Sequence, residues 1–199
     1  GGMFWDGRAT GWITGDPLAD QAMGPFLNPV EQNLSSDEDV CLKVADSRYA
    51  DLYVDVYGVA IDCATRDPFD GILYSYKNFA LAIAEFERSG EVSAFTSKFD
   101  YAMVGEASFT DQELWGQELF NGKAKCNLCH PGGVGGLFTD FTYDNLGVPK
   151  NEEYPLTGTP IDLGLGAVIS DLLENGKFKV MTLRNIGLTA PYGHNGYFE

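Results

Sequence analysis

The sequence predicts a mainly α-helical protein with long irregular loops, and three observations support this fold class. Apolar residues recur at helical spacing in two long stretches, and helix-capping residues stand at helix starts. Strands are hard to place anywhere in the chain, and no internal repeat or low-complexity segment is present. The 199 residues, 44% of them hydrophobic, are enough to bury one good core or two small ones.

The first half of the chain predicts loops followed by two helices. Residues 1–29 are rich in Gly, Pro, Trp and Asp without a sustained period, which predicts loops and short turns around a site. Ser36 precedes an acidic first turn and predicts the start of a helix that ends at Gly58. A second helix is predicted from about residue 69 to 89. Its apolar stripe consists of Ile72, Leu73, Tyr76, Phe79, Ala80, Ile83 and Phe86.

The second half predicts one well-marked helix and then irregular chain. Thr110 and Glu113 form a capping box, and the helix that they open closes at Gly122. Turn residues are too frequent in residues 137–160 for long regular elements. A short helix is expected at 168–173.

The residues directly after the Gly122 helix are the most informative in the chain. Cys126 and Cys129 lie three positions apart, and His130 follows at once, which is the attachment sequence of a c-type haem. In such a site two thiols add to the haem vinyl groups and the histidine binds the iron. A thioredoxin-like redox pair and half of a zinc site are the alternatives; the first normally follows a strand, and the second needs another ligand pair. A helix that leads into this motif is typical of a cytochrome c domain.

Charge and cysteine content restrict the environment and the partners. The formal net charge of −16 argues against a nucleic-acid partner and favours a cationic protein partner, although acidity can also serve solubility alone. No stretch is long and apolar enough for a membrane span, and no leader is visible, so we expect a processed or partial chain. Haem attachment implies a compartment outside the cytoplasm. There, Cys41 and Cys63 would favour a disulfide, with two buried free thiols as the alternative.

Several short motifs together resemble the bacterial dihaem cytochrome c peroxidases. They run in order across essentially the whole chain, and their agreement in register is more specific than any one of them. They are FWDGRA at residues 4–9, QAMGP at 21–25, NPVE at 28–31, CNLCH at 126–130, LRN at 183–185 and TAPYGHNG at 189–196.

The resemblance implies two cytochrome c-like domains with one haem c each. Residues 1–105 correspond to the C-terminal part of the domain that reduces peroxide, with the connecting helices. Residues 106–199 correspond to the electron-accepting domain, incomplete at its C-terminus and carrying one covalent haem. A second haem is expected in the full-length protein.

Three residues acquire catalytic or redox roles from the resemblance. Trp5 matches the tryptophan that conducts electrons between the haems, although an aromatic residue packed at a domain interface would suit the same position. Gln21 and Glu31 match the pair beside the peroxidatic iron. A glutamate there can move a proton between the two peroxide oxygens, and an amide can orient the peroxide by hydrogen bonds. Without the resemblance, Glu31 would read as a surface carboxylate.

Further positions match the surroundings of the second haem. Thr189 and Pro191 match positions whose backbone carbonyls help to hold calcium in the family. Arg184 and His194 match residues near the electron-accepting haem, where the guanidinium could pair with a propionate.

The chain departs from the family pattern in four ways. The first haem motif and the expected axial ligand of the second haem are both absent. Met181 stands where proline is common, and it is either a sixth haem ligand or a core residue. Residues 10–16 are an insertion, and its Trp12 could cover a haem edge or meet a partner.

These features predict a haem oxidoreductase, in the periplasm or otherwise outside the cytoplasm, that reduces hydrogen peroxide with electrons from a small cytochrome or copper protein. This stretch of chain is expected to be inactive alone. The donor is expected to be cationic, and the resemblance allows a homodimer. One alternative is a single-haem electron-transfer cytochrome without peroxidase activity. Another is oxidation of tryptophans on a partner protein, which close relatives perform.

Overall fold

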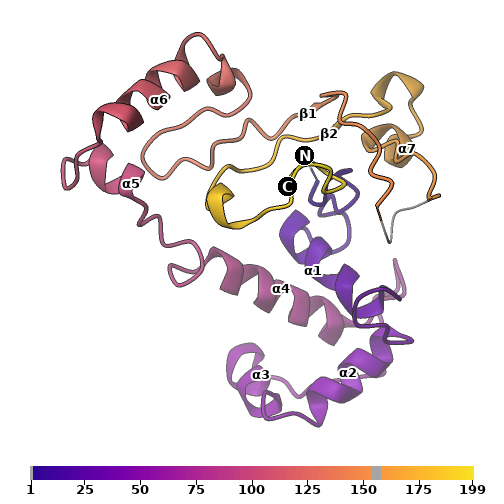
Figure 1. The fold of residues 1–199 in the computed structure, drawn as a ribbon. Helices are drawn as coiled ribbons and strands as arrows, with labels where there is room; N and C mark the ends of the chain where they lie inside the picture. The colour runs from indigo at the N-terminus through magenta and orange to yellow at the C-terminus, as the bar shows by residue number, and fades with distance from the viewer. Residues whose placement is uncertain (1, 154–157) are drawn as a thin grey trace. The chain divides into compact units, whose positions relative to one another are not determined.

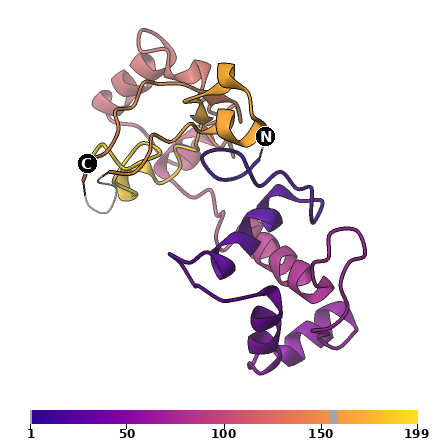
Figure 2. The same cartoon turned by 90° about the vertical axis from the view of Figure 1, so that its right-hand side faces the viewer.

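The computed structural model describes residues 2–153 and 158–199, and its chain forms two compact units (Figures 1 and 2). One unit consists of Ala9–Ser93 with Gly2, and we call it the inserted unit. The other joins Met3–Arg8 to Ala94–Glu199, and we call it the haem-motif unit. Residues 94–105, which sequence analysis grouped with the first domain, belong to the haem-motif unit because Arg184 pairs there with Asp100. The assignment of the units to the two domains of the family stays a prediction.

The inserted unit is built from four helices around one hydrophobic core. They are α1 (Pro17–Leu27), α2 (Asp37–Ala45), α3 (Ala50–Tyr57) and α4 (Tyr74–Arg88). Helix α1 packs along α4, as both views show (Figures 1 and 2). The core residues are Ala19, Ala22, Met23, Val40, Cys41, Tyr53, Leu73, Tyr76, Phe79, Ala80 and Ala84.

Helix α1 corrects the prediction that residues 1–29 form only loops and turns. Asp16 caps the helix by accepting a hydrogen bond from the Leu18 amide, and Pro17 occupies the first turn. Both are helix-start signals, but the short stretch behind them contains Gly24 and Pro25, which obscure the helical period.

The predicted helix from Ser36 to Gly58 is two helices, so this prediction was wrong about continuity. Ser36 caps α2 as expected, and Gly58, with φ of 69°, ends α3. Between them, the Ser47 hydroxyl donates to the Val44 carbonyl and accepts from the Tyr49 amide. These local bonds compete with helical bonds and separate the two helices.

Helix α4 begins five residues later than the predicted start near residue 69, because the preceding residues form a closed turn. The Asp67 amide donates to the Ile72 carbonyl, and the Gly71 amide donates to the Asp67 carbonyl. Lys77 adds ion pairs of 2.8 Å to Asp67 and 2.6 Å to Asp70.

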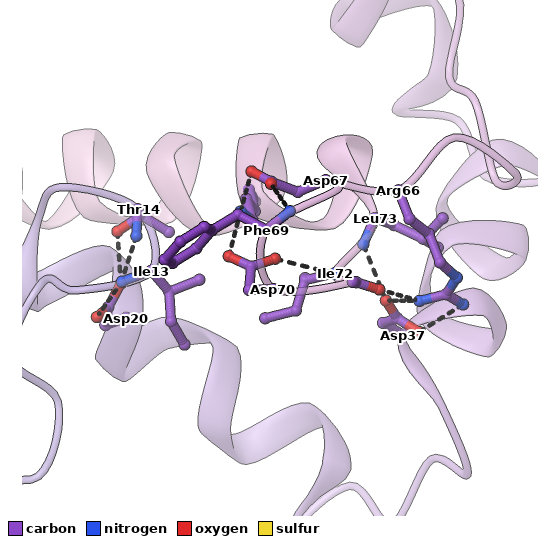
Figure 3. Close-up of polar contacts among 12 residues, drawn as sticks. Ile13, Thr14, Asp20, Asp37, Arg66, Asp67, Phe69, Asp70, Ile72 and Leu73 are labelled. Atoms are coloured by element: carbon purple, nitrogen blue, oxygen red, sulfur yellow. Dashed lines mark hydrogen bonds and ion pairs between the residues drawn. The ribbon is translucent and has the colours of Figure 1, made fainter.

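Two links fasten this turn region to α2. The Arg66 guanidinium donates to both carboxylate oxygens of Asp37, at 2.8 and 3.1 Å, and Asp37 also accepts from the Leu73 amide (Figure 3). A disulfide joins Cys41 to Cys63, the state that sequence analysis favoured over two free thiols.

The haem-motif unit is mostly irregular chain with short elements. The helices are α5 (Lys98–Met103), α6 (Asp111–Asn121) and α7 (Leu165–Ile169), with 3₁₀ turns η1 (Cys126–Leu128), η2 (Leu172–Glu174) and η3 (Ile186–Leu188). Two short strands that sequence analysis did not predict, β1 (Tyr143–Asp144) and β2 (Phe178–Lys179), pair antiparallel. The capping box of Thr110 and Glu113 opens α6 as predicted.

Few side chains of the haem-motif unit are fully covered. Among its described residues, Val180 is the only buried hydrophobic residue. The buried polar residues of this unit are Asp100, Thr139 and Lys179. This unit therefore lacks the apolar core that the inserted unit possesses. In the ranges 2–153 and 158–199, no helix has the length and apolar character needed to cross a membrane.

Candidate functional site

The haem-motif unit encloses a cavity of about 1100 Å³. Cys129 and His130 lie on its wall, and the wall also contains Trp5, Met181 and Arg184. Pockets for small molecules and cofactors are usually about 300–1,000 Å³. The cavity is thus large enough for a bulky planar cofactor.

A tight turn presents the motif residues to this cavity. Lys125 has a φ of 58°, and η1 follows it as a single 3₁₀ turn. The His130 amide donates to the Cys126 carbonyl at 2.9 Å, so one turn of backbone separates the first thiol from the imidazole. Both cysteines are free thiols and half-buried.

A backbone carbonyl orients the His130 imidazole. Its Nδ1 lies 2.7 Å from the carbonyl oxygen of Phe138. A carbonyl oxygen only accepts, so Nδ1 carries the proton and Nε2 keeps its lone pair. Such an imidazole can bind a metal through Nε2 while its other nitrogen donates to a fixed partner.

Acidic groups surround the second thiol. The Cys129 thiol donates to Asp144 over 3.6 Å. Burial, followed by the negative charges of Asp144 and Asp140, raises the pKa of the Cys129 thiol. The group is therefore held as a neutral thiol at neutral pH, unlike the low-pKa cysteines of disulfide oxidoreductases.

The residues present fit a covalently attached haem. One free thiol, that of Cys129, and a histidine with an available Nε2 lie on the wall of one large cavity, and the second free thiol, Cys126, precedes them by one turn of backbone. No second pair of zinc ligands accompanies them in the part of the chain that the structure describes. Among the described residues, no group of three or more His, Cys, Asp and Glu side chains is arranged to hold a metal ion. The donor set matches an iron held mainly by a porphyrin.

Arg184 lies at the cavity wall, but its guanidinium already has protein partners. Its Nη1 and Nη2 donate to the two carboxylate oxygens of Asp100, at 2.6 and 2.9 Å, and its Nε donates to the Gly136 carbonyl at 2.8 Å. Arg184 holds the pKa of the Asp100 carboxyl far below its usual value. Pairing with a haem propionate, expected from the resemblance, stays a prediction.

His194 also lines the cavity and is stacked on an aromatic ring. Its imidazole lies parallel to the Phe178 ring, with centroids 3.5 Å apart and planes 7° apart. Burial lowers the pKa of His194, and Asp162 opposes that shift. His194 is thus an ordered, neutral imidazole at neutral pH.

Four other predicted residues lie around the same cavity. Trp5 and Met181 are on its wall, and so are Thr189 and Pro191. The Trp5 carbonyl accepts a hydrogen bond from the Lys179 amide at 2.8 Å, which joins the start of the chain to β2. The calcium role of Thr189 and Pro191 stays a prediction.

The predicted catalytic pair lies in the inserted unit. Gln21 is half-buried on α1, and Glu31 is exposed in the turn after that helix. The Glu31 amide donates to the Asn28 carbonyl at 3.0 Å. No hydrogen bond joins the two side chains within the part of the chain that the structure describes, and their roles stay predictions.

A smaller cavity of about 410 Å³ lies beside α1 in the same unit. Its wall includes Met23 and Tyr76, and burial raises the pKa of Tyr76 to about 12. Its acidic groups have partners: Asp20 accepts from Thr14 and Ile13, and Asp37 accepts from Arg66 (Figure 3). The polar groups of this cavity therefore stabilise the fold.

Sequence reasoning missed three residues of the larger site. Asp100 binds Arg184, Asp144 contacts Cys129, and Phe138 supplies the acceptor for His130. Ser97 and Asp100 form a visible capping box, which could have indicated α5. A backbone acceptor leaves no side-chain signal, so Phe138 could not have been found in this way.

The fold and the site together define a helical protein with a c-type haem attachment sequence at a cofactor-sized cavity. A family model described as di-haem cytochrome c peroxidase matches residues 1–108. The chain therefore belongs to the di-haem cytochrome c peroxidase family, and this family implies haem c.

Individual relatives agree with this membership. The chain is 37% identical to the methylamine utilization protein MauG of Paracoccus denitrificans, over 100% of this chain and 51% of that protein. It is 33% identical to the cytochrome c peroxidase Ccp of Escherichia coli, over 98% of this chain and 37% of that protein. The crystal structure of the diheme peroxidase BthA from Burkholderia thailandensis matches with a TM-score of 0.82 and 27% identity, over 100% of this chain and 49% of that chain. The chain thus spans about half or less of the length of these proteins.

Proposed function

We propose that the protein containing this chain reduces hydrogen peroxide to water with electrons from a small redox protein. Two electrons and two protons convert one peroxide molecule into two waters. Family membership supports this activity, and the observation that carries it is the pairing of Cys129 with a His130 whose Nε2 is available, at one large cavity. The two proposed haem domains would both be cytochrome c-like.

The haem-motif unit would serve as the electron-receiving part. Cys126 and Cys129 would attach the haem covalently and His130 would bind its iron, while Arg184 and His194 line the cavity that Cys129 and His130 share. When bound, haem c supplies reversible one-electron chemistry. Trp5 lies on the wall of this cavity, 38% exposed, and would pass electrons toward the second haem of the full-length protein.

Proton transfer would fall to the inserted unit. Glu31 takes a proton from one peroxide oxygen and delivers it to the oxygen that leaves as water. The Gln21 amide orients the peroxide by hydrogen bonds without changing charge. The solvent exposure of Glu31 allows proton exchange with water.

Family membership, the disulfide and the net charge support a proposal for the cellular location and the electron donor. Covalent haem attachment and the Cys41–Cys63 disulfide favour a periplasmic location. The net charge of −16 favours a cationic donor, either a cytochrome or a copper protein. Backbone carbonyls of Thr189 and Pro191 would contribute to a calcium site, and a homodimer is part of the proposal.

The test uses the full-length protein. Intact mass and a pyridine haemochrome spectrum should give two haems per polypeptide. Glu31→Gln should then lower kcat for peroxide by about a hundredfold or more, because a positioned general acid–base contributes about 10²–10⁴-fold. Glu38→Gln, which changes an exposed carboxylate on α2, is the matched control.

One haem on a protein of this length would instead favour an electron-transfer cytochrome. Met181 lies on the same cavity wall as His130 and could complete its coordination. Unchanged turnover in Glu31→Gln would remove the proposed catalytic role.

A further inference from the structure

Arg184 joins two parts of the haem-motif unit that are far apart in sequence. Its guanidinium donates to both oxygens of Asp100 on α5, and its Nε donates to the Gly136 carbonyl. The Asp100 side chain is only 8% exposed and that of Arg184 16%. A bidentate pair with little solvent around it fixes the plane of the guanidinium.

The acidic partner is itself immobilised. Asp100 Oδ2 accepts from the Ser97 amide at 3.1 Å and from the Ser97 hydroxyl at 2.6 Å. The first of these bonds, together with the bond that the Asp100 amide donates to the Ser97 hydroxyl, forms the capping box of α5. The guanidinium is therefore anchored to the start of a helix.

The other end of this connection lies next to the haem histidine. Gly136 is two residues before Phe138, whose carbonyl accepts the His130 Nδ1 proton at 2.7 Å. The Phe138 ring packs edge-on against Phe99 of α5 with centroids 5.0 Å apart, and the Arg184 guanidinium carbon lies 5.4 Å from its centroid. Thus Arg184 and α5 hold residues 136–138 both by backbone and by side chain.

There is little room for this segment to move. A Cβ atom added at Gly132 would meet the Phe138 ring at 2.5 Å. Phe138 also has a φ of 54°, a conformation that an L-residue keeps only when its surroundings enforce it. The carbonyl direction at Phe138 therefore depends on the contacts that hold this segment.

We propose that Arg184 is a positioning residue of the haem site, which fixes the Phe138 carbonyl as acceptor for His130 and thereby sets the basicity of the imidazole toward iron. This inference rests on the proposed function, since it requires His130 to bind haem iron. A firm hydrogen bond from Nδ1 raises the basicity of a histidine ligand. A more basic ligand favours the oxidised iron, so loosening the bond should raise the midpoint potential.

The experiment compares variants of the haem-loaded, full-length protein. We call the hydrogen bonds of Arg184 to Asp100 and to the Gly136 carbonyl the clamp. Arg184→Gln removes the guanidinium of the clamp, and Asp100→Asn removes the negative charge of its acidic partner. Arg184→Lys keeps the positive charge without the bidentate geometry. Arg66→Gln is the matched control, because Arg66 makes the same bidentate pair with Asp37 and also donates to a glycine carbonyl, that of Gly71, in the inserted unit.

Two readouts separate positioning from a general loss of stability. Spectroelectrochemistry gives the midpoint potential of the haem bound through His130, and hydrogen exchange reports residues 130–141. We expect all three clamp variants to raise the potential and to speed exchange in this segment about tenfold, the effect of losing a charged hydrogen bond of at least 1.4 kcal/mol. Arg66→Gln should leave both unchanged.

The outcomes are distinct. An unchanged potential in both Arg184→Gln and Asp100→Asn would overturn the proposal, as would a shift in Arg184→Gln that Arg184→Lys fully restores, because charge near a propionate would then explain it. A wild-type protein without covalent haem would refute the proposed function instead, which the haemochrome spectrum reveals before any variant is made.

Discussion

His130 owes its orientation to one carbonyl oxygen, that of Phe138. The sequence alone identifies the histidine, since the motif spacing is specific to covalent haem. It does not identify the acceptor, which is a backbone atom eight residues away held by α5 and Arg184. Side-chain chemistry can be read from a motif, whereas a backbone partner depends on how the following loop folds.

Asp100 makes the free energy of unfolding of the haem-motif unit depend on pH in the acidic range. Its pKa is lowered chiefly by the Arg184 hydrogen bonds, so its stabilising effect is complete above the unfolded pKa of about 3.9 and is lost as pH falls through the folded value. We expect Asp100→Asn to cost about 3 kcal/mol in the free energy of unfolding at pH 7, because it leaves Arg184 without its carboxylate. The difference from wild type should shrink as pH falls below about 4.

Chemical denaturation at several pH values, followed by the absorbance of the haem-motif unit, measures this difference. Glu106→Gln, at an exposed carboxylate for which the structure records no ion pair, should change stability by less than about 0.5 kcal/mol. A difference for Asp100→Asn that stays constant from pH 7 to pH 2 would contradict the role of the ionised carboxylate.

At the scale of elements, the stability of the inserted unit depends on links between α2 and the turn before α4. The Cys41–Cys63 disulfide closes a segment with a sequence separation of 22, and Asp37 pairs with Arg66 nearby. The helical stripe of α4 and the capping residues of α2 and α6 could be predicted from sequence because they are local signals. The break between α2 and α3 could not, because it depends on how Ser47 bonds to the backbone.

Replacing both cysteines by serine should destabilise the inserted unit by about 3 kcal/mol, the chain-entropy value for a loop of this length. Urea unfolding followed by far-UV circular dichroism would measure it, with the haem potential as an internal reference that should not change. Glu38→Gln, at an exposed position on α2, provides a control for substitution near this region. If the free energy of unfolding falls by less than about 1 kcal/mol, the Asp37–Arg66 pair and the core hold the inserted unit together without the disulfide.

At the scale of the whole molecule, charge is the property that sequence predicts most directly. Asp and Glu number 29 against 13 Lys and Arg, and counting them needs no fold. Which residues line the large cavity of the haem-motif unit could be predicted only in part, because its wall combines Trp5 with residues from 129 to 195. Contacts between residues so far apart in sequence become known only from the complete fold.

An acidic protein should attract a cationic donor over long range. We expect the second-order rate constant for reduction by a cationic cytochrome to fall steeply as ionic strength rises from 0.01 to 0.1 M, since the Debye length shortens from about 30 to about 10 Å. Stopped-flow absorbance of the haem measures this rate. A neutral small-molecule reductant serves as control, and equal salt dependence for both would argue against electrostatic steering.

The chain order of the two units bears on the order in which they fold. The Met3 sulfur accepts from the Lys179 ammonium group, a contact between residues 176 positions apart, whereas the inserted unit draws its core from Ala19 to Ala84. Contacts of large sequence separation form slowly, and domains generally fold as units. The inserted unit can therefore fold early from contacts within residues 9–93, whereas residues 3–8 contact β2 only once the rest of the haem-motif unit has folded.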